Sequence, residues 1–377
     1  MVAKIKNLDV IAIWLLMSGI FLYQMFGPFG VLTDLAGHLN TAVYMLETDT
    51  YVVGNFLMYL MVNVLSCFTG NAMWMAIALP LLIATANTAK YVLVREAFKP
   101  EVGMNYARIA AFTLLFVTII PWFIPLRNWY MGYIIPNIWH NSTWICMMPF
   151  AIVTYILSIR QLEAFDTRRN GWITLFVVLS ICVKPSFFFI YGIAYPIIIL
   201  CRYGFKKEFG YTMIPIVVGM LLVLYQYVTI YFYGTPTDAD SSVVVDVWAP
   251  FKWETWQDKW DTWLLSFVLP TIFVVLYRKE VKRDYELWFV VLMMIVAMGI
   301  AICCYETGYR RYHGNFTWQL LSAMWFVFFY MLRVMSRHIK PDEKPAVREI
   351  VMMVLLAIHV VWGIAYLCRF MIDKTYF

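Results

Sequence analysis

Long apolar runs, separated by short polar segments, follow one another along almost the whole chain. A helix needs about 20 mainly apolar residues to cross a bilayer, and somewhat fewer where the membrane is thinned. Twelve runs approach this length: residues 9–27, 52–68, 72–94, 106–126, 143–159, 171–183, 186–201, 211–233, 263–277, 286–305, 317–335 and 350–368. The pattern predicts an all-α fold, a single polytopic transmembrane domain over residues 1–377.

The composition supports this class and excludes others. Apolar residues make up 63% of the 377 residues and charged residues only 14%, against about 25% charged in a typical soluble domain. A soluble enzyme is excluded, because such a chain cannot cover itself with polar surface. No phosphate-binding glycine loop and no His-Glu-x-x-His motif occurs, so ATP-driven transport and zinc proteolysis are not indicated. The net charge of +6 indicates membrane orientation, and no nucleic acid partner is expected.

The basic residues decide how many runs cross the membrane. If all twelve cross, basic loops fall on both sides, which the positive-inside rule disfavours. If the run 52–68 lies along the outer surface instead, 21 of the 29 Lys and Arg residues become cytoplasmic. They belong to the N-terminus and to the loops 90–108, 160–169, 202–207, 278–283 and 333–348. This topology has about 11 spans and places residues 28–71 and 234–262 outside.

The run 52–68 has a pattern that favours the interfacial interpretation. Asn55, Tyr59, Asn63 and Ser66 form a polar stripe on one face of a helix. An amphipathic helix of this kind lies in the interface plane, and residues 28–71 then form a first external loop with interfacial helices. The alternative is a spanning helix whose stripe faces other helices.

The first candidate for chemistry follows the first span. On a helix that begins at Asp34, the side chains of Asp34, His38 and Thr41 share one face. A carboxylate beside an imidazole is suited to proton transfer. The alternative is that Asp34 only caps the helix.

A second polar segment lies between the runs 106–126 and 143–159. It contains Arg127 and then Asn137, His140 and Asn141, three polar residues in close succession. Trp139 between them has the character of an interfacial anchor. The density of polar groups makes these residues candidates for substrate binding.

The densest external cluster is Glu306, Arg310, Arg311, His313 and Asn315. Two adjacent arginines outside break the positive-inside rule, and arginine forks bind phosphate or carboxylate. An anionic group bound at the outer surface would explain them. The alternative is a structural bridge between Glu306 and one of the arginines.

Two further features are polar. Lys184 lies at the break between the runs 171–183 and 186–201, where a charge at membrane depth indicates a function unless it reaches the headgroups. The external loop 234–262 combines carboxylates with five tryptophans between Trp248 and Trp263. That mixture is typical either of a sugar-binding surface or of an interfacial helix.

These features together resemble the GT-C superfamily of membrane glycosyltransferases. In that family a first external loop carries an acidic residue near its start and continues through interfacial helices, as with Asp34 and the helix 52–68 here. A second external loop often contains further functional residues, here Asn137, His140 and Asn141. The Asp-x-Asp or Asp-x-Glu of some members is absent, so no cofactor is assigned, although a divalent metal is compatible with the family. The motifs Pro-Asn-Ile-Trp-His-Asn and Glu-Thr-Gly-Tyr-Arg-Arg-Tyr-His-Gly-Asn-Phe also resemble those of bacterial envelope-polysaccharide proteins.

The resemblance implies transfer of a sugar from a polyprenyl-phosphate-linked donor to a glycan or lipid acceptor, in contact with membrane lipid. The site would face outward from a bacterial cytoplasmic membrane. Asp34 is expected to be the general base, helped by His38 or replaced by Glu306, in an inverting displacement. Arg310, Arg311 and Lys184 would hold the lipid phosphate. Two alternatives remain open: a polymerase that joins lipid-linked repeat units, and a flippase for lipid-linked saccharides.

Overall fold

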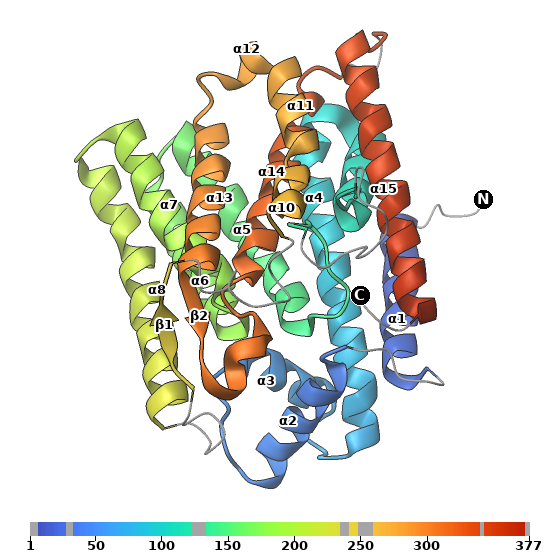
Figure 1. Ribbon diagram of the computed structural model, residues 1–377, viewed down its shortest axis with the longest axis vertical. Coiled ribbons are helices and arrows are strands. Elements are labelled where there is room, and N and C mark those ends of the chain that lie inside the picture. The colour runs from blue at the N-terminus through green and yellow to red at the C-terminus, as the bar shows by residue number, and fades with distance from the viewer. Residues whose placement is uncertain are drawn as a thin grey trace.

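A computed structural model describes residues 7–27, 33–121, 133–233, 241–247, 259–339 and 343–373, without the side chains of residues 259–261, 309, 312 and 313. Helices form nearly all of its regular structure, and they run mostly along the long axis (Figure 1). The predicted all-α class is confirmed.

The helices in the described part of the chain have the following bounds. They are α1 (Leu8–Phe26), α2 (Leu35–Glu47), α3 (Phe56–Leu65), α4 (Ala72–Phe116), α5 (Ser142–Glu163), α6 (Thr167–Val183), α7 (Ser186–Tyr203), α8 (Lys207–Phe232), α10 (Lys259–Ser266), α11 (Val268–Leu276), α12 (Arg278–Val281), α13 (Tyr285–Cys303), α14 (Trp318–Ser336) and α15 (Val347–Asp373). Strands β1 (Val243–Val245) and β2 (Cys304–Glu306) pair antiparallel, and a 3-10 helix, η3 (Gly308–His313), follows β2.

Eight of these helices are long and apolar enough to cross a membrane: α1, α4, α5, α7, α8, α13, α14 and α15. This number, taken over the described residues, supports a multi-pass integral membrane protein. The predicted run 72–94 and the part of the run 106–126 up to Phe116 lie within α4, whose 45 residues bend at Gly103, where φ is 74°. Helix α6 has 17 residues, and the run 263–277 is divided between α10 and α11. Each of the 11 predicted spans therefore contains helix, although helix in the run 106–126 ends at Phe116.

One assignment within α4 is wrong. The charge pattern predicts Lys90 at the start of a cytoplasmic loop, but α4 continues unbroken through it as far as Gly103. Lys90 is 4% exposed, and its ammonium donates to Asn137 Oδ1 at 2.8 Å. A lysine side chain does not by itself end a helix. The helix bends at Gly103, because glycine can adopt a positive φ.

Helix α3 differs from both interpretations of its stripe. Tyr59, Asn63 and Ser66 are 3%, 4% and 5% exposed, so the polar face points into the protein, as in the alternative interpretation. With 10 residues, however, α3 is about 15 Å long, half the thickness of the hydrocarbon core. It is therefore too short to cross.

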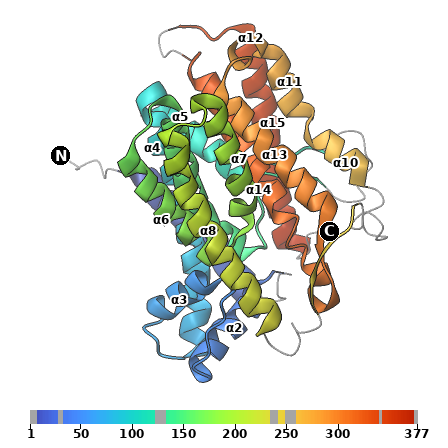
Figure 2. The same ribbon diagram turned by 90° about the vertical axis from the view of Figure 1, so that its left-hand side faces the viewer.

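The two ends of the molecule are built differently. Helices α2 and α3 lie at one end and α12 at the other (Figures 1 and 2). On the side of α12, Arg333 of α14 pairs with Glu286 of α13 at 2.7 Å and with Glu163 of α5 at 2.9 Å, and it also contacts Glu101 of α4. These ion pairs join four helices at the α12 end of the molecule.

Candidate functional site

The carboxylate of Asp34 lies at the amino end of helix α5. Its Oδ1 accepts hydrogen bonds from the backbone N–H of Ser142 at 3.0 Å and from the Ser142 hydroxyl at 2.5 Å. Its own backbone N–H donates to the carbonyl of His140 at 3.2 Å. The side chain makes no capping bond to α2, so the capping alternative is wrong. The amino end of a helix, with its unpaired N–H groups and positive dipole, stabilises an anion there.

His38 supplies the second contact of this carboxylate. Its Nε2 lies 3.2 Å from Asp34 Oδ2, across one turn of α2. Burial raises the pKa of Asp34, but the hydrogen bonds and charge of His38 and the two donors of Ser142 outweigh it and hold this pKa below its ordinary value. About 29% of the Asp34 side chain remains exposed. The group is therefore an ionised carboxylate within reach of a ligand.

Lys184 is held by the same turn of α5. It ends α6, it is 9% exposed, and its ammonium donates to Thr143 Oγ1 at 3.0 Å and to Asn141 Oδ1 at 3.5 Å. The ammonium also lies 5.3 Å from the centre of the Trp318 ring. These contacts are all with uncharged groups.

Burial and nearby charges have opposite effects on the pKa of Lys184. Burial lowers the pKa of Lys184 to about 8, while the negative charges of Asp34 and Glu306 raise it. Three consecutive residues thus organise the site: Ser142 holds the carboxylate, while its two neighbours hold the ammonium.

Two further residues predicted in the second polar segment, Asn137 and His140, pack against protein groups. Asn137 donates from Nδ2 to the carbonyls of Leu114 at 3.1 Å and Val117 at 2.8 Å, and it is 3% exposed. Its contacts close the carboxyl end of α4, which favours a structural role. The ring of His140 packs at 5.8 Å from that of Trp318, and burial lowers its pKa to about 4, with Lys184 acting in the same direction and Asp34 against it.

Glu306 is the most completely enclosed carboxylate of the predicted set. It is 4% exposed and accepts hydrogen bonds from the Tyr231 hydroxyl and from Asn315 Nδ2, the latter at 2.6 Å. Arg310 pairs with it at 3.5 Å and lies 5.7 Å from the centre of the Tyr231 ring. The structural bridge considered from the sequence is thus present. Arg311 is exposed.

The remaining predictions can be placed only in part. Arg127 and the side chain of His313 lie outside the described residues, as does most of the loop 234–262, whose described part includes β1. Sequence reasoning did not select Ser142 or Thr143, which hold the two charges. It noted Tyr59 only as part of a stripe, although its hydroxyl lies 2.8 Å from His38 Nδ1.

A metal site was tested against the side chains. No group of three or more His, Cys, Asp or Glu side chains that could hold a metal occurs among the described residues. Asp34 and Glu306 each already accept several hydrogen bonds from protein groups. The described residues do not fit a metal centre of this kind.

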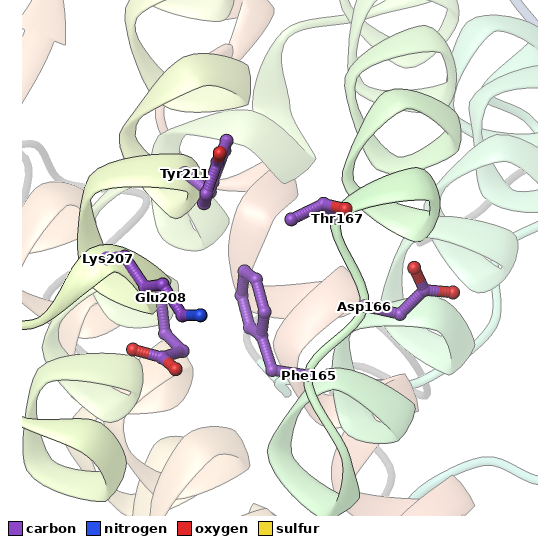
Figure 3. A pocket seen from close by; sticks show the side chains of 6 residues that line it. All are labelled: Phe165, Asp166, Thr167, Lys207, Glu208 and Tyr211. Carbon is purple, nitrogen blue, oxygen red and sulfur yellow. The ribbon is translucent and has the colours of Figure 1, made fainter.

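A cavity of about 390 Å³ opens elsewhere, where the α5–α6 connection meets the start of α8. Figure 3 shows Phe165 and Thr167 on one side and Lys207, Glu208 and Tyr211 of α8 on the other. None of the predicted site residues lines it, so it is separate from the Asp34 site.

No protein-family model matches the chain, and no curated protein matches it. Among the solved structures, the chain is similar to the oligosaccharyltransferase of Archaeoglobus fulgidus in its apo form, with 11% sequence identity and a TM-score of 0.45. The similarity covers 99% of this chain and 57% of that chain, so this chain spans little more than half of that protein.

Proposed function

We propose that this protein is a membrane glycosyltransferase of the GT-C type. In this proposal it moves a sugar from a polyprenyl-phosphate-linked donor to a glycan or lipid acceptor on the outer side of a bacterial cytoplasmic membrane. Asp34 is the general base, His38 orients it, and Lys184 holds the phosphate of the donor. Arg310 and Arg311 form the outer rim of the phosphate site.

One observation carries the proposal: an ionised carboxylate and a buried ammonium are fixed by adjacent residues of one helix end. Asp34 is partly exposed and is hydrogen-bonded to His38 and Ser142, while Lys184 has only neutral hydrogen-bond partners. A buried ammonium without a bonded anion is costly. A lipid phosphate would compensate that charge beside a base.

The chemistry assigned to these groups is a single displacement. The acceptor hydroxyl attacks the anomeric carbon and loses its proton to Asp34, while the bond from that carbon to the phosphate oxygen breaks. Negative charge grows on the departing phosphate, and the ammonium of Lys184 stabilises it. Glu306 takes no proton in this scheme because Arg310, Asn315 and Tyr231 already occupy its carboxylate.

Mass spectrometry of lipid that co-purifies with the protein tests the donor class. The proposal expects an enriched polyprenyl phosphate that carries a sugar, and it expects Lys184→Met to lose most of it. Lys206→Met, an exposed lysine between α7 and α8, is the matched control and should retain the lipid. Equal lipid profiles in all three proteins would contradict the proposal.

Reconstituted vesicles then separate the three classes of activity. A transferase adds one sugar to the acceptor, a polymerase gives a ladder of products, and a flippase moves labelled lipid without a new glycosidic bond. The proposal expects the first result, and either of the others would overturn it.

A further inference from the structure

The side chains of Asp34, His38 and Tyr59 form a continuous hydrogen-bonded series that joins α2 to α3. His38 Nε2 lies 3.2 Å from Asp34 Oδ2, and His38 Nδ1 lies 2.8 Å from the Tyr59 hydroxyl. The two rings pack with their centres 5.7 Å apart, tilted by 48°. Tyr59 is 3% exposed, so its hydroxyl is hydrogen-bonded to His38 within the protein rather than to bulk water.

The directions of these hydrogen bonds follow from the chemistry of the groups. An ionised carboxylate only accepts, so the nitrogen that faces Asp34, Nε2, must carry the proton. In a neutral imidazole the other nitrogen, Nδ1, is then an acceptor, and Tyr59 must donate to it. Burial raises the pKa of Tyr59 to about 12, so this hydroxyl keeps its proton and remains a donor.

We propose that Tyr59 is a positioning residue that holds His38 in the tautomer with its proton on Nε2, so that His38 always presents a donor to Asp34. The structural part of this inference stands on the geometry alone. Its consequence for catalysis rests on the proposed function, in which Asp34 is the base.

Loss of the Tyr59 hydroxyl removes the constraint on the tautomer of His38. Without a donor at Nδ1, the proton is free to occupy either nitrogen. In the second tautomer a bare Nε2 lone pair faces the carboxylate, which repels it, and the ring turns away. Asp34 then loses one of the hydrogen bonds that hold its pKa down, and this pKa rises toward the ordinary value for aspartate.

The other groups around these side chains do not replace Tyr59. Thr41 of α2 and Asn55, just before α3, are neutral groups near the Tyr59 hydroxyl. Arg310, which belongs to neither helix, lowers the pKa of Tyr59 through its positive charge. On the far side of Asp34, His140 and Lys184 act electrostatically on the carboxylate. The Nδ1 of His38 lies against the Tyr59 hydroxyl and its Nε2 against Asp34, so the tautomer depends on Tyr59.

The test is nitrogen-15 NMR of histidine-labelled protein in lipid nanodiscs at pH 8, where histidine side chains are normally neutral. His38→Gln identifies the His38 signals by their disappearance. In the wild type, Nε2 should give the signal of a protonated nitrogen and Nδ1 that of a bare one. Tyr59→Phe should give both tautomers, whereas Tyr44→Phe, which removes an exposed hydroxyl from α2, should leave the signals unchanged.

Two results would overturn the inference: a wild-type His38 with its proton on Nδ1, or an unchanged tautomer in Tyr59→Phe. The first needs no variant, so the inference stays testable even if Tyr59→Phe fails to fold. In a transfer assay, Tyr59→Phe should lower kcat about tenfold with little change in the donor KM. The acid limb of its pH profile should move to higher pH. Correct tautomers without any sugar transfer would refute the proposed function while leaving this inference intact.

Discussion

Asp34 and Glu306 are two carboxylates from polar segments of one sequence, but they differ in exposure and in hydrogen-bond partners. The Asp34 side chain is 29% exposed, and that of Glu306 is 3% exposed. Asp34 is held by a helix end, a serine and a histidine, without a lysine or arginine bonded to it. Glu306 is closed by a tyrosine, an asparagine and Arg310.

This difference separates a base from a bridge. A general base must lie within hydrogen-bond reach of a substrate proton and must change its charge during the reaction. We propose Asp34 as the base because its carboxylate is partly exposed and its hydrogen-bond partners are donors. Protonation of Glu306 would break a pair with Arg310 in a place that water barely reaches, which is costly. Burial and partner type, rather than residue type, therefore distinguish the two roles.

Replacement of Asp34 should give the largest effect. Asp34→Asn keeps the size of the side chain but removes the proton acceptor, so kcat for transfer should fall by about 10²–10⁴. Asp49→Asn is the matched control: Asp49 is exposed near the end of α2 and has a φ of 51°, a conformation that asparagine adopts readily. Equal rates for these two variants in a reconstituted assay would contradict the assignment.

Replacement of Lys184 should come next. Lys184→Met removes the ammonium while keeping a long side chain over Trp318, and the donor KM should rise about 10–100-fold, since a hydrogen bond to a charged group is worth about 1.5–3 kcal/mol. The acceptor KM should change much less. A larger change in the acceptor KM than in the donor KM would contradict the assignment of Lys184 to the donor phosphate.

The pH dependence of donor binding gives a finer version of the same test. The pKa of Lys184 is lowered to about 8, so its charge is present below that pH and is lost as the pH rises through it. The donor KM should therefore rise above pH 8 in the wild type. In Lys184→Arg it should stay flat over this range, because arginine remains charged. An alkaline rise that persists in Lys184→Arg would assign it to another group.

Replacement of Glu306 should have the smallest effect on catalysis. Glu306→Gln removes the charge that faces Arg310, so the protein should lose about 1–3 kcal/mol of stability while transfer per folded molecule stays near the wild-type rate. Thermal unfolding measures the first quantity and a folded-protein-normalised assay the second. Glu47→Gln, an exposed change at the end of α2, should alter neither. Loss of transfer with unchanged stability would exchange the roles of Glu306 and Asp34.

The sequence predicted the helices well because apolar length is a local property. Each predicted run contains helix, even where α4 includes one run and the first part of the next and where α6 is short. The prediction of Lys90 in a loop was wrong because charge alone does not end a helix. The helix bends only at Gly103. The inward direction of the α3 stripe depends on packing against neighbouring helices, which no single segment specifies.

The site was predictable in its charges but not in their connections. Asp34 and Lys184 stand out because each is a charge in an unusual place. Their common attachment to Ser142, Thr143 and Asn141 joins segments that are distant in the chain, from 41 to 108 residues apart. A contact across such separations leaves no local pattern.

Chemical rescue tests the central assignment most directly. Asp34→Ala removes the base and opens a space beside an accessible site, so added formate should enter and accept the proton in its place. The account predicts that formate restores transfer to Asp34→Ala in proportion to its concentration and has no effect on Glu306→Ala. Rescue of Glu306→Ala, with none for Asp34→Ala, would show that the base is Glu306 and would contradict the account.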